Sequence, residues 1–392
     1  MVITVKPEDA SYALFDPTFE REVPEQTEVI HTPSREIFNL YRRLFRKENL
    51  PTGGFANEDH PSFAEKASRF IRGNFFIPDP RKGWNRFALR AASSRLEKEE
   101  FHCVITSSPP HSTQLIGRKL HRKFKIPWLA DLRDPWTDIY YFQKLYPTLP
   151  ARMLHLRCER STLKRADRIM TVGPALKQLL QQKHALPEGK VAVLPNGFDE
   201  EDFQSLSPPR KEDHLITYVG TLSDQYPIDG FVDAMSQILT LHPQVRIRFV
   251  GSVSSQQRML LETLPHPSVE YLPHVSHSRA LEYMMQSGIL LLVIPRHSSS
   301  RAIITGKLFE YLASGTSILG LGPPDGDAAD IVHETGRGRF VEYEDTPTMI
   351  AFVNWILEGN ITDEGIPAAV SRYSRKSLSR ELSLIMDALT EE

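Results

Sequence analysis

The amino-acid sequence predicts an α/β protein made of two tandem Rossmann-like domains, each a doubly wound parallel sheet, that face one another across a cleft. The chain has 392 residues, which is more than a single core normally accommodates. Short β-rich runs alternate with amphipathic segments of helical length, the pattern of parallel sheets flanked by helices. Turn-forming and charged residues over 195–213 divide this alternation into two halves.

In the first half, apolar runs and helical periodicity place strands and helices in alternation. The strands are expected at Val2–Val5, Cys103–Ser107, Trp128–Ala130, Ile169–Val172 and Val191–Leu194. The helices are expected at Ile37–Lys47, Phe63–Arg72, Trp84–Glu99, Thr113–Lys123, Arg152–Ala166 and Ala175–Lys183. Ser112 is the expected cap of the helix that follows it. Gly and Pro mark most of residues 49–83 as a long loop.

The second half repeats the architecture without repeating the sequence. Its strands are expected at Ile216–Val219, Arg246–Val250, Glu270–Leu272, Ile289–Ile294, Ser317–Leu319 and Phe340–Val341. Its helices are expected at Phe231–Leu241, Gln256–Leu264, Arg279–Met285, Lys307–Ala313 and Thr346–Leu357, with a last amphipathic helix at Ser374–Leu389. We therefore divide the chain into domains at 1–195 and 196–373, and interpret 374–392 as a helix that returns to the first domain.

Composition excludes several classes of protein. The two cysteines, Cys103 and Cys158, cannot build a disulfide framework or a thiolate metal site. The longest apolar run, Ile289–Ile294, is far too short to cross a membrane, and the N-terminus lacks the pattern of a secretory signal. These features favour a cytoplasmic protein. The net charge is −2, yet residues 35–125 carry 19 Lys and Arg against 9 Asp and Glu. This half is expected to meet an anionic partner, unless it is an ordinary solvated surface.

The most informative segment lies between Arg296 and Asp330. A buried strand is expected to end at Pro295, and a helix is expected to open at Gly306. The first turn of a helix offers unpaired N–H groups that bind phosphate, and Lys307 adds a cation beside them. Glu310 shares a helix face with Lys307, and a carboxylate there can accept hydrogen bonds from both hydroxyls of a ribose. A plain Lys–Glu surface pair is the alternative interpretation.

Further candidates for a nucleotide site follow neighbouring strands. Gly220 and Thr221 lie where the Ile216–Val219 strand meets its loop, and a glycine there lets the backbone approach a pyrophosphate. A simple turn is the alternative. Arg296 and Arg301 carry planar guanidinium groups that match phosphate oxygens. The acidic group Asp325, Asp327 and Asp330 is interpreted as a helix-capping set, and no paired-Asp metal motif follows a strand.

Two strand ends in the first half direct polar residues toward the same cleft. One strand leads through Ser108 to His111, and the next leads into Asp131, Arg133 and Asp134. His111 is placed to contact a sugar, and either Asp is suited to orient an acceptor hydroxyl or to take its proton. Structural roles are the alternatives: a histidine that merely begins a helix, and an Arg133 that locks one Asp by a bidentate pair.

The strings GKLFEYLASGTSIL, SSPPHS and DLRDPW together resemble glycosyltransferases of the GT-B fold, especially the retaining family 4 group. The resemblance implies a nucleoside-diphosphate sugar held by the second domain, with Glu310 on the donor ribose and Gly306, Lys307 and Leu308 beside it. It places the acceptor on the first domain, where Ser108 and Arg133 border the reaction centre. Glu159 also matches a recurrent family position, and we expect it to support the cleft.

The same resemblance implies metal-independent transfer, in which positive groups and helix dipoles stabilise the leaving nucleoside diphosphate. Three departures from the family pattern are visible. Ala302 stands where the family often has a second glutamate, the donor loop GTLSDQYPIDG lacks a Lys or Arg, and Val2–Val5 resembles the family's second strand, so that the first strand and its Gly loop are expected to be absent. These departures favour one alternative, a non-catalytic sugar-nucleotide or lipid-binding partner of a polysaccharide assembly complex. A sugar-nucleotide epimerase of the same GT-B fold is a second alternative.

Aromatic and basic residues also alternate in the first half, at Tyr41–Lys47 and from Phe75–Ile77 to Arg81–Trp84. This pattern suits a peripheral association with the inner face of an anionic membrane, and it suits ordinary amphipathic helices as well. A lipid-linked or saccharide acceptor in surface polysaccharide or glycoconjugate assembly would agree with a membrane partner. No nucleic-acid-binding motif is present, so a nucleic-acid partner is not expected.

Overall fold

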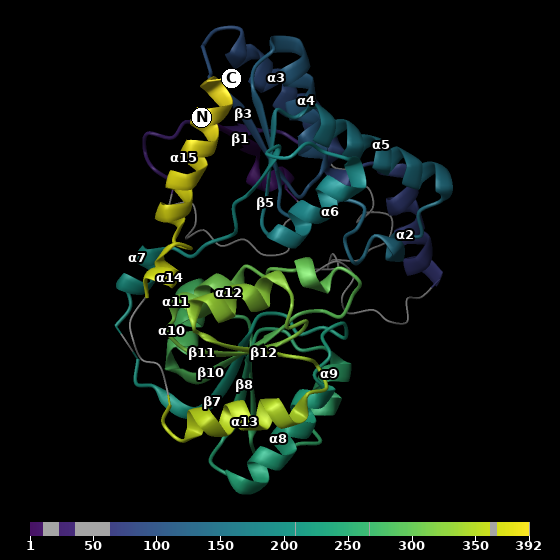
Figure 1. Cartoon of the computed structure of the whole chain (residues 1–392). Helices are drawn as coiled ribbons and strands as arrows, with labels where there is room; N and C mark the ends of the chain where they lie inside the picture. The colour runs from purple at the N-terminus through teal and green to yellow at the C-terminus, as the bar shows by residue number, and fades with distance from the viewer. Residues whose placement is uncertain (11–22, 36–62, 208, 266, 361–366, 392) are drawn as a thin grey trace.

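A computed structural model describes residues 1–10, 23–35, 63–207, 209–265, 267–360 and 367–391. It consists of two α/β lobes stacked end to end, with parallel strands inside each lobe and helices on both faces (Figure 1). The prediction of two doubly wound parallel-sheet units is confirmed. We call residues 1–195 the N-lobe and residues 196–373 the C-lobe.

The N-lobe holds two separate parallel sheets. Its strands are β1 (Val2–Val5), β2 (Val29–Thr32), β3 (Val104–Ser108), β4 (Trp128–Leu132), β5 (Arg168–Thr171) and β6 (Val191–Val193). Strands β3 to β6 pair in chain order, whereas β1 pairs with β2, a strand that the sequence did not predict. Ile3 of β1 and Val104 of β3 both pack against the cluster between α3 and α4. No ladder among the described residues joins these two strands.

Helices cover both faces of the N-lobe sheet. They are η1 (Pro7–Asp9), α2 (Phe63–Phe75), η3 (Pro80–Trp84), α3 (Asn85–Leu96), α4 (Ser112–Phe124), η4 (Gln143–Leu145), α5 (Leu149–Arg165) and α6 (Pro174–His184). The helix predicted over Ile37–Lys47 lies outside the described residues. Trp84, expected to face a membrane, instead packs on the α3–α4 cluster and donates its indole N–H to Thr32 Oγ1 at 2.7 Å.

The C-lobe contains one parallel sheet of order β12-β11-β10-β7-β8-β9. Its strands are β7 (Glu212–Val219), β8 (Arg246–Val250), β9 (Val269–Leu272), β10 (Ser287–Val293), β11 (Ser317–Leu321) and β12 (Gly338–Val341). The chain winds outward from β7 through β8 to β9 and then returns to place β10 on the other side of β7. The boundary between β7 and β10 is therefore a topological switch point, where open α/β sheets bind ligands.

The C-lobe helices are α7 (Glu200–Gln204), α8 (Asp229–Leu241), α9 (Ser255–Leu261), α10 (His277–Gln286), η5 (Ser300–Ala302), α11 (Lys307–Ala313), α12 (Asp327–Thr335), α13 (Thr346–Leu357) and α14 (Ala368–Ser371). Helix α12 was not predicted, because its acidic start was taken only as a capping set. The central strand β10 is buried along its whole length, which explains its unbroken apolar sequence.

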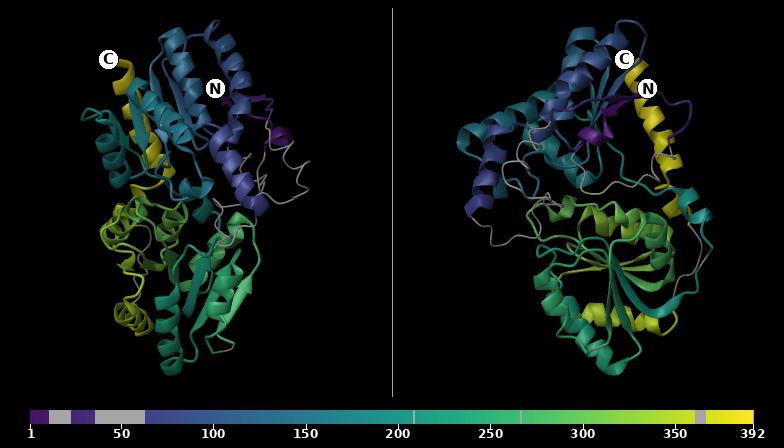
Figure 2. Two further views of the ribbon diagram at one scale, coloured as in Figure 1. Left: turned by 90° about the vertical axis from the view of Figure 1, so that its right-hand side faces the viewer. Right: turned by 180° about the vertical axis from the view of Figure 1, so that it is seen from behind.

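The last helix, α15 (Arg375–Glu391), leaves the C-lobe and runs alongside the N-lobe (Figure 2). Its Leu378 and Leu389 pack on Leu129 of β4 and Met170 of β5. This apolar seam joins the end of the chain to the first lobe. Within the part of the chain that the structure describes, every helix is too short or too polar to cross a lipid bilayer.

Candidate active site

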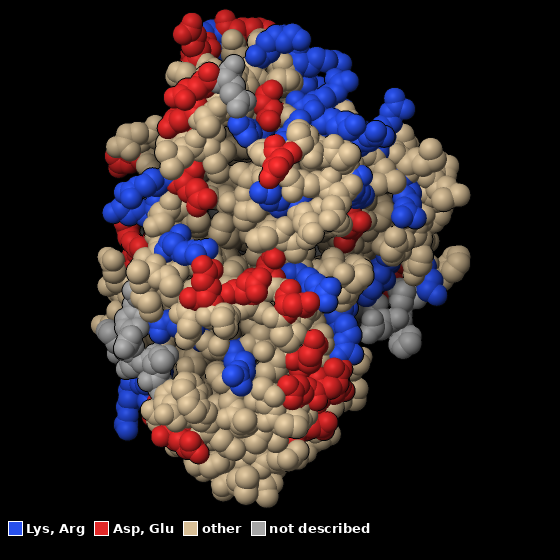
Figure 3. All heavy atoms as spheres, in the orientation of Figure 1, with Lys and Arg blue, Asp and Glu red and all other residues tan. Residues whose placement is uncertain are grey.

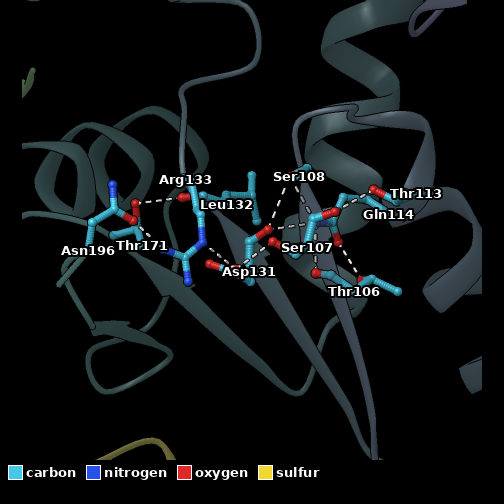
Figure 4. Close-up of polar contacts among 10 residues, drawn as sticks. All are labelled: Thr106, Ser107, Ser108, Thr113, Gln114, Asp131, Leu132, Arg133, Thr171 and Asn196. Atoms are coloured by element: carbon cyan, nitrogen blue, oxygen red, sulfur yellow. Dashed lines mark hydrogen bonds and ion pairs between the residues drawn. The ribbon is translucent and has the colours of Figure 1, made fainter. Parts of the chain in front are cut away.

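The carboxylate of Asp131 is held firmly at the ends of β3 and β4 (Figure 4). The parallel register sets Ser107 opposite Asp131, and Ser107 Oγ donates to Asp131 Oδ2 at 2.7 Å. Arg133 Nε donates to the same oxygen at 2.9 Å, and the Arg133 guanidinium also contacts Asn196. Arg133 thus holds the Asp131 carboxylate as expected, but through one nitrogen and not as a bidentate pair. Asp131 is only 3% exposed, which leaves it a structural anchor.

Ser108 is fixed in the same network. Gln114 Nε2 of α4 donates to Ser108 Oγ at 2.9 Å and to the backbone oxygen of Asp131 at 2.8 Å. Ser108 Oγ donates in turn to that same backbone oxygen at 3.1 Å. These bonds connect β3, β4 and α4, so Ser108 shapes the rim of the cleft from a buried position.

Asp134 differs from Asp131 in having an unengaged carboxylate. Among the described residues its side chain forms no hydrogen bond or ion pair, and burial raises its pKa. A carboxylate that is short of partners and has a raised pKa is suited to accept a proton from a hydroxyl group. Of the two predicted candidates, the geometry therefore favours Asp134.

His111 lies at the end of β3, immediately before α4. Its ring stacks on the indole of Trp136, with ring centroids 4.7 Å apart and planes 9° apart. Burial lowers the pKa of His111 from 6.5 to about 4, so the imidazole is neutral at pH 7. Its Nδ1 is buried and has no hydrogen-bond partner among the described residues. A neutral, oriented imidazole can exchange hydrogen bonds with a sugar hydroxyl but supplies no charge.

The expected helix cap by Ser112 is wrong. Ser112 is the first residue of α4, and its backbone N–H donates to Asp79 Oδ2 at 2.7 Å. Ser112 Oγ donates to the other oxygen of Asp79 at 2.9 Å. A carboxylate from a preceding loop thus satisfies a free N–H of the first turn of α4, the N–H of Ser112 itself.

Glu159 supports the cleft from inside the N-lobe. It is fully buried and accepts hydrogen bonds from Lys183 Nζ at 2.9 Å and Thr137 Oγ1 at 2.8 Å. His184 Nε2 lies 3.4 Å away. Burial by itself would raise the pKa of Glu159, but His184, Lys183 and Thr137 outweigh burial and lower it from 4.5 to about 2. The charged network ties α5 to α6 and to the loop that carries Trp136.

On the C-lobe, Gly220 and Lys307 meet at the switch point. Gly220 has φ +119, and a Cβ placed there would lie 3.0 Å from Lys307 Nζ. The ammonium group also lies 4.0 Å from the centroid of the Tyr218 ring. Burial lowers the pKa of Lys307 from 10.5 to about 7, and Glu310 opposes that shift. Thr221 is exposed beside them, and its backbone oxygen accepts the Tyr218 hydroxyl at 2.8 Å.

Glu310 pairs with a histidine that the sequence analysis did not single out. His277 Nε2, at the start of α10, lies 3.0 Å from Glu310 Oε1, and His277 Nδ1 lies 4.0 Å from Asp202. Lys307 instead lies over Tyr218, so the anticipated Lys–Glu surface pair is not the arrangement observed. The contact with His277 orients one carboxylate oxygen and leaves Glu310 partly exposed at the mouth of the switch point.

Three predicted donor residues lie elsewhere. Arg301 forms an ion pair with Asp325 at 2.8 Å on the surface, and Arg296 pairs with Glu344. Leu308 is fully buried in the C-lobe core, so its side chain cannot meet a ligand. Gly306 is exposed and precedes α11, but this helix has only seven residues and offers a short dipole. The donor constellation therefore reduces to Gly220, Thr221, Gly306, Lys307 and Glu310.

Comparisons with known proteins show what the chain is similar to. Residues 37–202 match the family model described as Glycosyltransferase Family 4. This part of the chain is therefore similar to family 4 glycosyltransferases. Sucrose-phosphate synthase from Thermosynechococcus elongatus has a TM-score of 0.55 at 16% identity, covering 79% of this chain and 80% of its own. Anabaena HepE in complex with UDP-glucose has a TM-score of 0.55 at 13% identity, covering 77% and 82%.

A third similar structure is an α,α-trehalose-phosphate synthase from Burkholderia vietnamiensis, with a TM-score of 0.55 at 14% identity, covering 77% of this chain and 74% of its own. At such identities these likenesses show the fold, and that fold is GT-B. The comparison with curated proteins found no match.

The two lobes touch at Ala302, the position where family 4 glycosyltransferases often have a second glutamate. Ala302 of η5 packs against the N-lobe cluster that includes Leu176 and Leu180. Beside it, Asp327 at the start of α12 accepts hydrogen bonds from the backbone N–H of Ala175. Asp327 was predicted to cap a helix, but the helix start that it satisfies belongs to the other lobe.

Sequence reasoning missed His277, Trp136 and Asp327 as parts of the site. His277 follows a strand end, so the rule that found His111 applies to it equally. Trp136 stands two residues after Asp134 in the DLRDPW string, and its partner His111 comes from another strand. The hydrogen bonds between Asp327 and Ala175 could not be predicted from the sequence around either residue. Within the described residues, no group of three or more His, Cys, Asp or Glu is arranged to hold a metal ion.

Proposed function

We propose that this protein is a glycosyltransferase that moves a sugar from a nucleoside-diphosphate sugar to a saccharide or lipid-linked acceptor, without a metal ion and with retention of configuration, in surface polysaccharide or glycoconjugate assembly. The observation that carries the donor assignment is the meeting of Lys307, Gly220 and Glu310 at the C-lobe switch point. Similar folds bind such ligands: HepE is in complex with UDP-glucose, and the pneumococcal O-GlcNAc transferase GtfA is in complex with UDP and GlcNAc. A uridine nucleotide is therefore the first donor to test.

In this proposal the two ends of the donor are recognised by different chemistry. The Glu310 carboxylate, held by His277, accepts hydrogen bonds from the ribose hydroxyls. The diphosphate lies against Gly220, where the absent Cβ leaves room, and the Lys307 ammonium neutralises part of its charge. Lys307 is fixed by its contact with Tyr218, so it needs little reorganisation when charge develops.

The transfer step breaks the bond between the sugar C1 and the leaving phosphate oxygen. The acceptor hydroxyl oxygen forms the new bond to C1 on the same face, and its proton passes to the free carboxylate of Asp134. The electron pair of the broken bond stays on the nucleoside diphosphate, whose added charge Lys307 stabilises. Neutral His111 fixes a sugar hydroxyl, while Asp131 and Arg133 keep the loop in place.

An anionic membrane is the proposed partner of the N-lobe. Phe75 is 73% exposed near the end of α2, and Leu149 and Met153 are 76% and 68% exposed on α5. A hydrogen bond joins the end of α2 to the start of α5, so these side chains share one region. Arg152 and Arg157 are exposed on the same helix, and Figure 3 shows Lys and Arg gathered over the upper part of the N-lobe. Apolar side chains among cations suit the interface of an anionic bilayer.

Liposome sedimentation tests the membrane proposal. Vesicles with a third of phosphatidylglycerol should retain the protein at low salt and release it at high salt, because surface attraction is screened. Vesicles of phosphatidylcholine alone should retain less. The double variant Phe75→Ser/Leu149→Ser should lower the bound fraction several-fold, whereas Leu241→Ser, at an exposed apolar residue of the C-lobe, should not. Equal retention by both kinds of vesicle would contradict the proposal.

Thermal stabilisation by nucleotides tests the donor assignment. A ligand at about 100 times its Kd contributes roughly 2.7 kcal/mol to the folded state, which gives a clear rise in Tm. We expect the rise with UDP or another nucleoside diphosphate and its loss in Glu310→Ala. The matched control is Glu381→Ala, at an exposed glutamate of α15 far from the switch point. A Tm unchanged by every nucleotide tested would refute the donor assignment.

Product analysis separates transfer from the alternative functions. A transferase releases nucleoside diphosphate in proportion to the glycosylated acceptor. A sugar-nucleotide epimerase would convert the donor without any acceptor, and a non-catalytic partner would bind the donor and leave it intact. The engaged Asp131 and the free Asp134 favour a reacting centre, because a purely binding protein gains nothing from a half-buried carboxylate without partners.

A further inference from the structure

A cavity of about 360 Å³ lies between the two lobes, next to the donor constellation but separate from it. Its N-lobe wall includes Tyr140, from the loop that follows β4. Its C-lobe wall includes Gln225 after β7, Gln257 of α9, and Arg296 and His297 after β10. None of these residues belongs to the group Gly220, Lys307 and Glu310. Both sets nevertheless include residues that come after β7 and after β10. The cavity volume corresponds to a small organic ligand.

The charges of this wall balance. The acids Asp224 and Asp229 are matched by the bases Lys144 and Arg296. Asp224 accepts a hydrogen bond from the Ser254 hydroxyl, and Arg296 pairs with Glu344 outside the cavity. Burial lowers the pKa of His297, which favours its neutral form. A wall with no surplus of either sign offers little attraction to a phosphate or a carboxylate.

Apart from these charged residues, the polar lining of the cavity consists mainly of glutamine amides. Gln257 is 4% exposed, and its Nε2 donates to the backbone oxygen of Tyr226 at 3.0 Å. Its Oε1 has no hydrogen-bond partner within the described residues, and neither does the buried Nε2 of Gln225. A buried polar atom without a partner costs about 1–3 kcal/mol, so a ligand with hydroxyl groups would relieve an existing penalty. The two amides supply one acceptor and one donor.

Two aromatic rings, one from each lobe, also line the cavity. The Tyr140 ring lies 6.4 Å from the His297 ring, with the planes at 67°, so the two rings close one corner of the cavity. A sugar ring combines apolar C–H faces with hydroxyl groups around its edge. Its faces suit an aromatic wall, and its hydroxyls suit amides and a phenol.

We propose that this cavity binds a neutral saccharide, with the sugar ring against Tyr140 and its hydroxyls bonded to Gln225 and Gln257. The inference rests on the proposed transferase function and extends it, because it assigns part of the acceptor site to the C-lobe. Tyr140 is six residues beyond Asp134 in the same loop, so a saccharide held here lies on the acceptor side of the cleft.

Ligand-observed NMR with UDP present at saturation tests this proposal. The probes are the neutral disaccharides maltose, cellobiose, lactose and chitobiose, with glucose 6-phosphate and glucuronic acid as anionic comparators. At least one neutral disaccharide should bind, and Tyr140→Ala and Gln225→Ala should each weaken that binding tenfold or more. Gln182→Ala, at an exposed glutamine of α6, is the matched control. The Kd for UDP should stay within twofold in every variant, which also shows that the variants are folded.

The donor's own sugar is the second source of the same chemistry, and one comparison separates the two. If the cavity holds the transferred sugar, the variants will weaken UDP-glucose binding and leave both UDP and free disaccharides unaffected. In that case the cavity is still a saccharide site, but the saccharide it holds is the donor's sugar and not the acceptor. The proposal is overturned if no neutral saccharide binds the wild type, if anionic sugars bind tighter, or if the variants change neither ligand. A failure to bind UDP at all would instead count against the proposed function.

Discussion

The carboxylate of Asp327 in the C-lobe accepts hydrogen bonds from the backbone N–H of Ala175 in the N-lobe, at 3.1 Å and 3.0 Å to its two oxygens. Ala175 is in the first turn of α6, where backbone N–H groups have no partner within the helix. A Cβ on Gly173 would lie 2.2 Å from an oxygen of Asp327, so the glycine permits the approach. One lobe thus caps a helix of the other and holds the cleft in the observed arrangement.

Removing this cap should favour an opened arrangement of the lobes. Asp327→Ala deletes the acceptor, and Gly173→Ala obstructs its approach, with an expected cost of about 1–3 kcal/mol for the contact. Small-angle X-ray scattering should show a larger radius of gyration for both variants. Asp330→Ala removes an exposed carboxylate of the same helix and should scatter like the wild type. An unchanged radius in both cap variants would show that other contacts hold the lobes.

The affinity for nucleoside diphosphates should fall as the pH rises above about 7. Burial lowers the pKa of Lys307 to about 7, so the ammonium loses its proton above that pH in the free protein. An anionic ligand favours the protonated form, and binding above pH 7 must therefore take up a proton, at a cost of up to tenfold in affinity per pH unit. Titration calorimetry of UDP between pH 6 and 9 measures this slope.

Lys307→Arg is the control for that slope, because a guanidinium stays charged throughout the range. Its UDP affinity should be flatter with pH than that of the wild type, whereas Lys307→Met should be weak at every pH. The ionisation of the nucleotide itself affects all three proteins alike. Identical slopes in the wild type and the arginine variant would assign the pH dependence to another group.

The Glu159 network should make stability sensitive to acid. The pKa of Glu159 is lowered in the folded protein, to about 2 from an unperturbed 4.5. A lowered acid pKa contributes stability that is complete above about 4.5 and is lost as the pH falls toward 2. Urea unfolding of the wild type should therefore weaken across this window, and Glu159→Gln should show a smaller dependence there.

The same glutamate should be costly to remove at neutral pH. Glu159→Ala leaves Lys183 and His184 without their buried carboxylate, a type of change that costs about 3–5 kcal/mol. Glu188→Ala, at an exposed glutamate after α6, is the matched control and should stay near the wild type. A loss below about 1 kcal/mol in Glu159→Ala would contradict the structural role.

Asp134→Asn should abolish most transfer while leaving the donor site intact. A positioned general base contributes about 10²–10⁴-fold to a rate, so kcat should fall within that range while the Kd for UDP stays unchanged. Asp131→Asn should act differently. It breaks the bonds from Ser107 and Arg133, so its main effect should be a lower Tm. Nucleoside diphosphate release with a glycosylated acceptor provides the rate. Activity within twofold of the wild type in Asp134→Asn would exclude its role as the base.

Much of this fold could be predicted because its signals are local. The unbroken apolar run of β10 and the amphipathic period of α13 are written in adjacent residues, and strand-end reasoning then placed Gly220, His111 and Asp134 at the cleft. Strand β2 escaped prediction because its VIHT sequence is short and half polar. Helix α12 was not predicted because its acidic first residues and the Gly-containing segment before it are typical of a loop.

Pairings between distant side chains could not be predicted from the sequence. Glu310 was expected beside Lys307, yet its hydrogen-bond partner is His277 from another helix. Arg301 was expected to face the diphosphate, but it forms an ion pair with Asp325. Asp79 displaced Ser112 as the cap of α4 for the same reason. Sequence spacing fixes which residues share an element, whereas the partner of a long charged side chain depends on how the elements pack.

The central claim is that the C-lobe switch point binds a nucleotide through Glu310 and its ribose hydroxyls. Calorimetry with UDP and 2′-deoxy-UDP, on the wild type and on Glu310→Ala, tests it most directly. The wild type should bind UDP about tenfold more tightly than the deoxy form, because Glu310 loses a hydrogen bond to a charged group. Glu310→Ala should bind both nucleotides equally weakly, so that the two losses are not additive. If the deoxy form loses the same affinity in both proteins, Glu310 does not contact the ribose and the donor site lies elsewhere.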